Sequence, residues 1–193
     1  MLKKILPPNP SLHNPWETLK VHIVYDNPWI QVSHRDVVNP SGNPGIYGVV
    51  HFKNLAIAIV PLDEKCDTWL VGQYRYTLNC FSWEVPEGGG QMDVPPIVSA
   101  QRELLEETGI SASQWIEVGE IHTSNSVTDE RGVIFAAKDL SFGLAQPEET
   151  ELLSVRKLPF SEAISMVESG EITDALSICA LYKVKAMLEK GFL

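Results

Sequence analysis

A dense run of carboxylates lies near the middle of the 193-residue chain, in residues 102–110, which read RELLEETGI. In a helix, Glu103 and Glu107 lie four residues apart and Glu106 lies beside them, so all three carboxylates share one face. Like charges at this spacing repel one another, and a hard divalent cation such as Mg²⁺, which takes oxygen ligands, would relieve the repulsion. On charge pattern alone, a solvated acidic face of a surface helix explains the run equally well.

The residues upstream of this helix favour the metal-site interpretation. Residues 83–90, which read WEVPEGGG, predict a strand that runs into a glycine-rich loop. Such a loop allows the backbone to approach a ligand closely, because glycine has no Cβ. A strand, a glycine loop and a helix with paired glutamates together form the arrangement of a metal-assisted phosphate site.

Turn signals and hydrophobic alternation divide the chain into the elements that must position these residues. Strands are expected at 21–25, 29–38, 46–52, 55–60, 68–76, 82–87, 115–122, 132–137 and 154–158, with 46–52 and 55–60 forming a hairpin. Helices are expected at about 97–108, ending at Gly109, from Ser161 to Gly170 and from Thr173 to about Gly191, with Ser161 and Thr173 as N-caps. Many strands, one mid-chain helix and two final helices predict an α+β sandwich with a mixed sheet.

The composition limits the classes of function. Acids outnumber bases by 25 to 15, and the formal charge of -10 argues against a nucleic acid partner, because a phosphate backbone needs a basic footprint. The 44% hydrophobic content supplies a core, and no apolar run reaches the ~18 residues of a membrane-spanning helix. The three cysteines, Cys66, Cys80 and Cys179, fit neither a disulfide framework nor a zinc site and favour a reducing, cytoplasmic location.

Residues 88–110 resemble the Nudix box, in which a glycine, five residues, a glutamate and seven residues precede Arg-Glu-apolar-any-Glu-Glu-any-Gly-apolar. Gly88 matches the first position, and every named position from Arg102 to Ile110 matches as well. Val94 stands where the box has its first glutamate, which in the family mainly braces the box arginine. We therefore expect a changed loop with an intact metal site.

Segments outside the box also look like the ADP-ribose and nucleotide-sugar pyrophosphatase branch of this family. They are residues 27–30 (NPWI), 72–76 (GQYRY), 128–131 (TDER), 148–151 (EETE) and Val155. The resemblance implies a Nudix α/β/α sandwich with a mixed sheet in residues 46–193, preceded by an N-terminal antiparallel strand extension in residues 1–45. It also implies a homodimer, in which the N-terminal strands contact those of the partner or exchange with them.

The resemblance implies a metal site on the predicted helix. Mg²⁺, with Mn²⁺ as an alternative, would be bound mainly by Glu103 and Glu107. Glu106 and the carbonyl oxygen of Glu87 would complete the protein ligands. In this role Glu103 and Glu107 count as catalytic residues as well as ligands.

A later loop should supply a catalytic base or a carboxylate that orients the metal. Glu151 aligns with that family position, and Glu149 and Glu130 are the alternatives. The acidic stretch around Glu151 is explained equally well as a plain hydrophilic loop. Glu130 could instead contact the distal ribose or be a polar turn residue.

The resemblance also implies substrate contacts. Arg75 would bind a phosphate or the terminal sugar, because a guanidinium offers a planar fork of donors. Trp29 would stack on the base or pack in a dimer core, and Gly88 would approach the substrate through its backbone. Arg102 is expected to be structural, paired with nearby acids such as Glu84.

The expected reaction is hydrolysis of the pyrophosphate of ADP-ribose or another nucleoside diphosphate sugar, which gives a nucleoside monophosphate and a sugar phosphate. ADP-ribose enzymes of this family usually carry a proline about fifteen residues beyond the box, and Asn125 occupies that place. The base and sugar therefore stay open. The alternatives are a Nudix hydrolase of other nucleoside polyphosphates and a non-catalytic Nudix domain that binds nucleotides.

Overall fold

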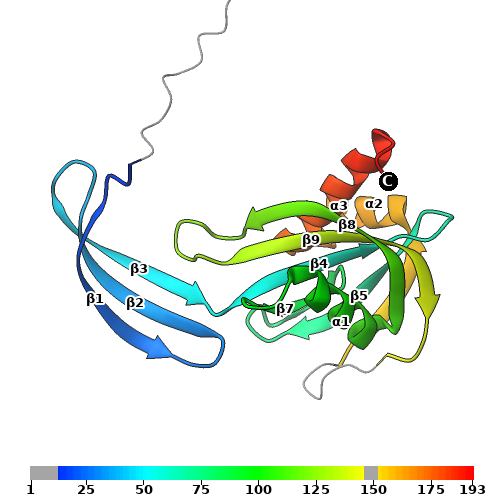
Figure 1. The fold of residues 1–193 in the computed structure, drawn as a ribbon, viewed down its shortest axis with the longest axis horizontal. Helices are drawn as coiled ribbons and strands as arrows, with labels where there is room; N and C mark the ends of the chain where they lie inside the picture. Colours follow the sequence, from blue (N-terminus) through cyan, green and yellow to red (C-terminus); the bar gives the residue numbers. More distant parts are fainter. Residues whose placement is uncertain (1–12, 146–151) are drawn as a thin grey trace, which may run out of the picture. The chain divides into compact units, whose positions relative to one another are not determined.

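The computed structural model describes residues 13–145 and 152–193. The chain consists of two compact units, Met1–His51 and Phe52–Leu193. The first unit is built from strands, and the helices of the described residues belong to the second (Figure 1). Of these helices, none has the length and apolar character that crossing a membrane requires.

The N-terminal unit is a three-stranded sheet in the order β1-β2-β3. Its strands are β1 (Glu17–Asp26), β2 (Ile30–Val38) and β3 (Pro44–Phe52). β1 and β2 are antiparallel, and Asn27 Oδ1 in the turn between them accepts hydrogen bonds from the N–H groups of Trp29 (2.9 Å) and Ile30 (2.7 Å). Asparagine stabilises tight turns in this way, so the turn predicted between these two strands is confirmed.

The hairpin predicted for residues 46–52 and 55–60 is wrong. β3 belongs to the N-terminal sheet, whereas β4 (Asn54–Pro61) is an inner strand of a different sheet. β4 is buried over most of its length. Its continuous apolar run is typical of a strand that has neighbours on both edges and cover on both faces.

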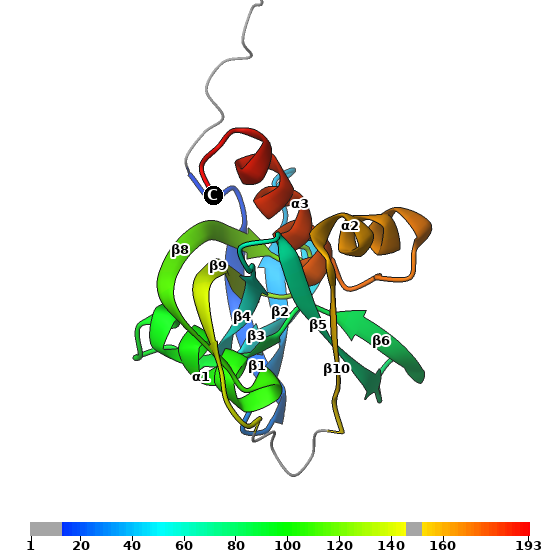
Figure 2. The same ribbon diagram turned by 90° about the vertical axis from the view of Figure 1, so that its right-hand side faces the viewer.

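The second unit contains two sheets (Figures 1 and 2). The first has the order β7-β4-β9-β8, in which β4 and β9 are parallel and the other neighbours are antiparallel. The second has the order β10-β5-β6 and is antiparallel. Their further strands are β5 (Asp67–Arg75), β6 (Cys80–Glu84), β7 (Glu87–Gln91), β8 (Ile110–His122), β9 (Arg131–Phe142) and β10 (Ser154–Pro159). The predicted mixed sheet is therefore confirmed.

Helices cover both faces of the mixed sheet. They are α1 (Pro96–Thr108), α2 (Phe160–Ser169) and α3 (Ala175–Glu189). Ile57 of β4 belongs to an apolar cluster with Leu104 of α1, whereas its neighbour Ala58 belongs to a second cluster with Leu181 of α3. Successive residues of a strand point to opposite faces, so α1 and α3 lie on opposite sides of β4. The α+β class and the α/β/α sandwich are confirmed.

The helix ends follow the sequence in part. α1 ends at Gly109 as predicted, with a left-handed φ of 71°, and a Cβ there would lie only 2.6 Å from the carbonyl oxygen of Gly143. The caps predicted for the later helices are wrong. α2 follows Pro159 without a side-chain cap, and α3 is capped by Asp174, which accepts a 2.6 Å hydrogen bond from the N–H of Ser177.

Candidate active site

Two of the three predicted carboxylates of α1 face the interior. Glu103 and Glu107 are 7% and 1% exposed, whereas Leu105 between them is 45% exposed. The helix therefore directs Glu103 and Glu107 toward the protein interior and Leu105 toward the solvent. A solvated surface face does not explain Glu103 and Glu107, because ionisable side chains are rarely buried without a partner.

The first residues of β7 lie directly on these two acids. The predicted glycine-rich loop begins as a strand, because Glu87–Gln91 pairs with β4. The backbone N–H of Glu87 donates a 3.0 Å hydrogen bond to Oε2 of Glu107. A Cβ at Gly88 would collide with the carboxylate of Glu103. A side chain at this position would therefore have to displace the Glu103 carboxylate from where it now lies.

Arg102 connects the same helix to β7. Its guanidinium donates to Oε1 of Glu103 (2.6 Å), to Oε2 of Glu106 (2.6 Å) and to the carbonyl oxygen of Gly89 (2.8 Å). Arg102 is thus paired with nearby acids as expected, but Glu84, the acid named as an example, is not one of them. Arg102 thus pairs with two of the predicted metal ligands, Glu103 and Glu106. Val94 stands at the box position of the glutamate that braces this arginine in the family, and it offers no carboxylate.

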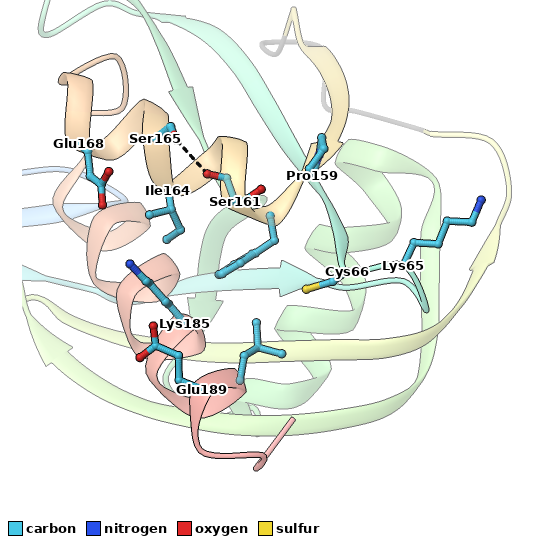
Figure 3. A pocket seen from close by; sticks show the side chains of 11 residues that line it. Lys65, Cys66, Pro159, Ser161, Ile164, Ser165, Glu168, Lys185 and Glu189 are labelled. Atoms are coloured by element: carbon cyan, nitrogen blue, oxygen red, sulfur yellow. Dashed lines mark hydrogen bonds between the residues drawn. The ribbon is translucent and has the colours of Figure 1, made fainter.

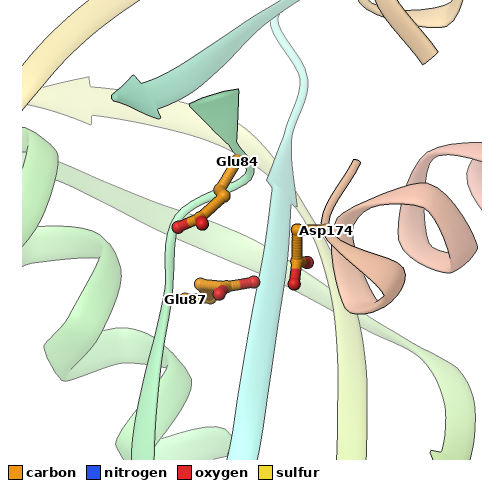
Figure 4. Close-up of side chains that lie close together, drawn as sticks. All are labelled: Glu84, Glu87 and Asp174. Atoms are coloured by element: carbon orange, nitrogen blue, oxygen red, sulfur yellow. The ribbon is translucent and has the colours of Figure 1, made fainter. Parts of the chain in front are cut away.

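The partner of Glu84 is Arg75, at the end of β5. Nη2 of Arg75 lies 2.6 Å from Oε2 of Glu84 and 2.8 Å from Oε1 of Glu87, and its Nε lies 2.9 Å from Oε1 of Glu84. Asp174, the cap of α3, completes this group: carboxylate oxygens of Glu84, Glu87 and Asp174 lie within 4.8 Å of one another (Figure 4). Arg75 therefore holds two acids together.

The electrostatics of this group are dominated by buried negative charge. Burial raises the pKa of Glu87 well above its ordinary value, and the nearby charges of Asp174 and Glu84 raise it further, against the opposing effect of Arg75. Oε2 of Glu87 is buried and has no hydrogen-bond partner in the described structure. A buried polar atom without a partner is costly, so this position favours an additional cation or donor.

The donor set fits a hard divalent cation. Carboxylates of Glu84, Glu87, Glu103 and Glu107 gather around the start of β7, with the guanidinium groups of Arg75 and Arg102 at their edges. The atoms of this group that could bind a metal are all carboxylate oxygens, and oxygen is the ligand type of Mg²⁺ and Mn²⁺. The residues present are therefore suited to a divalent metal that also binds phosphate oxygens.

Sequence reasoning missed Asp174. It stands in a Thr-Asp pair before the last helix, and this pattern indicates only a helix start. The fold brings the start of α3 beside the β6–β7 connection, where the N–H of Val85 donates a 3.0 Å hydrogen bond to Oγ of Ser177. No local signal in the sequence announces that proximity.

The remaining predicted residues lie elsewhere. Glu130, before β9, accepts a hydrogen bond from the hydroxyl group of Thr123 in the β8–β9 connection. Trp29 belongs to the N-terminal unit and is 66% exposed. Glu149 and Glu151 lie outside the described residues.

A separate pocket of about 530 Å³ lies beside α2 and α3 (Figure 3). Its lining includes Cys66, Lys65 and Lys185 and none of the predicted site residues. Partial burial and the charges of Asp63 and Asp67 raise the pKa of the Cys66 thiol. Because the thiolate is the reactive form, this pocket does not present an activated nucleophile. The candidate active site stays at α1 and β7.

Comparison with known proteins identifies the family of the chain. The NUDIX domain family matches residues 52–178, and the family described as nucleoside diphosphate sugar hydrolase N-terminal domain matches residues 16–50. An ADP-ribose pyrophosphatase of Mycobacterium tuberculosis is 31% identical over 179 residues, covering 89% of this chain and 84% of the relative. A second ADP-ribose pyrophosphatase, from Bacillus subtilis, is 28% identical over 167 residues, covering 86% and 90%.

A solved structure has the same fold. The crystal structure of an ADP compounds hydrolase matches with a TM-score of 0.82 and covers 91% of this chain and 95% of its own. Its sequence is 21% identical, so the likeness concerns the fold.

Proposed function

Because the chain belongs to the Nudix family, we propose that it hydrolyses the pyrophosphate of ADP-ribose or a related nucleoside diphosphate sugar. The products are a nucleoside monophosphate and a sugar phosphate. The names of the two similar pyrophosphatases and the match of residues 16–50 to the nucleoside diphosphate sugar hydrolase N-terminal domain support this substrate class. The observation that carries the proposal is the buried pair Glu103 and Glu107 directly under the β7 backbone.

Mg²⁺, or Mn²⁺ in its place, is the metal of this site. Glu103 and Glu107 are the main ligands, with Glu106 and the carbonyl oxygen of Glu87 as further ligands. A bound divalent ion polarises the diphosphate and activates the attacking water. Gly88 leaves room for Glu103 at the strand, and the N–H of Glu87 fixes one oxygen of Glu107, so the backbone of β7 orients both acids.

Several side chains are assigned to the substrate. Arg75 lies at the rim of the carboxylate group and is 36% exposed, which leaves its guanidinium within reach of a phosphate. Trp29 stacks on the base, and Glu130 contacts the distal ribose. Glu151 acts as the base or orients the metal, with Glu149 and Glu130 as the alternatives.

The chain acts as a homodimer in the cytoplasm. β1 is exposed at every position and carries apolar side chains such as Val21, Ile23 and Val24 on its surface. Large exposed apolar patches mark interaction sites, and contact or exchange with the partner's N-terminal strands would cover this one. The three cysteines are free, in keeping with a reducing compartment.

The substrate is tested by incubating the purified protein and Mg²⁺ with ADP-ribose, ADP-glucose, GDP-mannose, UDP-glucose, NADH and dGTP, followed by quantification of the products. The proposal expects turnover of ADP-ribose or a nucleotide sugar with release of the nucleoside monophosphate. Preferred turnover of dGTP would indicate a Nudix hydrolase of other polyphosphates. Binding of these compounds without turnover would indicate a non-catalytic domain, an alternative that the intact Glu103, Glu106 and Glu107 argue against.

A further inference from the structure

The backbone between β6 and β7 is attached to three other elements over three successive residues. The N–H of Val85 donates a 3.0 Å hydrogen bond to Oγ of Ser177 on α3. The carbonyl oxygen of Pro86 accepts a 2.8 Å hydrogen bond from a backbone N–H of β4. The N–H of Glu87 donates to Oε2 of Glu107 on α1. This stretch of backbone therefore joins α3, the mixed sheet and the helix of the metal site.

The hydroxyl group of Ser177 is the acceptor for a buried donor. Ser177 and Val85 are both 0% exposed. Helix propensity does not explain a serine at this position, because alanine is the better helix former and a buried hydroxyl group is costly unless it is hydrogen-bonded. The bond to Val85 does explain it, since an alanine here would leave a buried N–H without its acceptor.

The start of α3 holds Ser177 in place. Asp174, the residue before the helix, accepts a 2.6 Å hydrogen bond from the N–H of Ser177 and so fixes the first turn. Leu176 and Val85 belong to the same apolar cluster, so the helix start and the β6–β7 connection share one core. Figure 4 shows this start of α3 beside the segment that carries Glu87. A substitution of the Ser177 hydroxyl group leaves the Asp174 cap intact, because the cap uses the backbone N–H.

We propose that Ser177 is a positioning residue of the metal site. Its hydroxyl group fixes the backbone that leads into Glu87, and the N–H of Glu87 in turn orients Glu107. The inference rests on the proposed function, in which Glu107 and the carbonyl oxygen of Glu87 are metal ligands. Groups that orient metal ligands are worth about 10–100-fold in affinity, and Ser177 acts one step further away, so Ser177→Ala should weaken Mn²⁺ binding by about tenfold.

Amide hydrogen exchange in the metal-free full chain, followed by nuclear magnetic resonance, measures the positioning directly. In Ser177→Ala, the amides of Val85 and Glu87 should exchange about tenfold faster than in the wild type, because one hydrogen bond of this segment is lost. The amide of Phe135, on β9 in the mixed sheet, should exchange as in the wild type. A general loss of stability would instead speed the exchange of all three amides.

Electron paramagnetic resonance of free Mn²⁺ then compares the affinities of the folded variants. Ser177→Thr keeps the hydroxyl group and should bind Mn²⁺ as the wild type does. Ser82→Ala, which removes the hydroxyl group of a buried serine on β6, is the matched control and should also bind as the wild type does. If Ser177→Ala does not fold, Ser177→Cys replaces it with the same direction of change expected, because a thiol is only a weak acceptor.

Two results separate this inference from the proposed function. A folded Ser177→Ala that binds Mn²⁺ as tightly as the wild type, or that exchanges the Glu87 amide at the wild-type rate, would overturn the role of Ser177 and leave the proposed function standing. A wild type that binds no Mn²⁺ would overturn both.

Discussion

The backbone N–H of Glu87 donates a 3.0 Å hydrogen bond to Oε2 of Glu107. This bond joins the first residue of β7 to the last acid of the α1 run, two segments that the sequence places on either side of a glycine-rich stretch. It orients a carboxylate that is 1% exposed. The proposed chemistry depends on that orientation, because a metal ligand needs a fixed position.

Glu107→Gln should weaken Mn²⁺ binding by at least about 10–100-fold, since even the groups that orient metal ligands are worth that much. The amide oxygen of glutamine still accepts the hydrogen bond from Glu87, so the thermal midpoint should fall little. Electron paramagnetic resonance of free Mn²⁺ measures the affinity. Glu117→Gln, on strand β8, is the control, and equal affinity in both variants would refute Glu107 as a ligand.

Gly88→Ala should disrupt the site, because its Cβ would collide with the Glu103 carboxylate. The carboxylate is the end of a flexible side chain and can move aside at a small cost in stability, but its displacement should weaken metal binding. Gly89→Ala is the matched control one residue away, since its Cβ would meet only Nδ2 of Asn54 at 3.7 Å. Urea unfolding and Mn²⁺ titration compare the two. If Gly88→Ala bound Mn²⁺ as tightly as Gly89→Ala and were as stable, the close approach of Gly88 to the Glu103 carboxylate would be contradicted.

Arg75→Gln should destabilise the protein by about 3–5 kcal/mol, because it leaves the buried acids Glu84 and Glu87 without their cation. The control is Arg156→Gln. Arg156 pairs with Glu162 at the surface, where both side chains are more than 40% exposed, and such pairs contribute about 0–1 kcal/mol. Chemical denaturation measures both. Similar losses in the free energy of unfolding for the two variants would show that Arg75, Glu84 and Glu87 do not form a buried network.

Asp63 gives the stability a defined pH dependence. Burial alone would raise its pKa, but hydrogen bonds from Lys157, Asp67 and Lys65 outweigh burial and lower the pKa below the ordinary 3.8. The folded state thus keeps this carboxylate charged at lower pH than the unfolded chain does. Its contribution is fully present above pH 3.8 and is lost as the pH falls further.

Asp63→Asn should therefore lower the thermal midpoint by a few degrees at neutral pH, and the difference from the wild type should shrink as the pH falls below 3.8. Calorimetry across this pH range measures the difference. The neighbouring Glu64→Gln should leave the midpoint nearly unchanged. A difference in thermal midpoint that grows as the pH falls would contradict a lowered pKa of Asp63 in the folded state.

The sequence predicts most of what local patterns determine. Glu103 and Glu107 share a face because of helical spacing alone, and Gly109 ends α1 because it adopts a left-handed conformation. The α+β class with a mixed sheet follows from the order of strands and helices, whereas the α/β/α sandwich follows from the resemblance to the Nudix family. These signals lie within a few residues of one another or repeat along an element.

The sequence does not predict contacts between distant segments. Arg75, and not Arg102, binds Glu84, because the pairing of β5 with β6 places Arg75 beside it. Asp174 joins the carboxylates through the placement of α3, and the strand β7 replaces a loop because β4 offers it an edge. Each is decided by packing across the fold, which local propensity does not encode.

The Mg²⁺ dependence of ADP-ribose hydrolysis, measured as AMP and ribose 5-phosphate formed by the wild type, tests the proposed function most sharply. A metal-dependent pyrophosphatase should form equal amounts of the two products, should require Mg²⁺ or Mn²⁺ for turnover, and should lose turnover in folded Glu103→Gln and Glu107→Gln. Turnover that persists in a metal chelator, or that survives both substitutions, would contradict it.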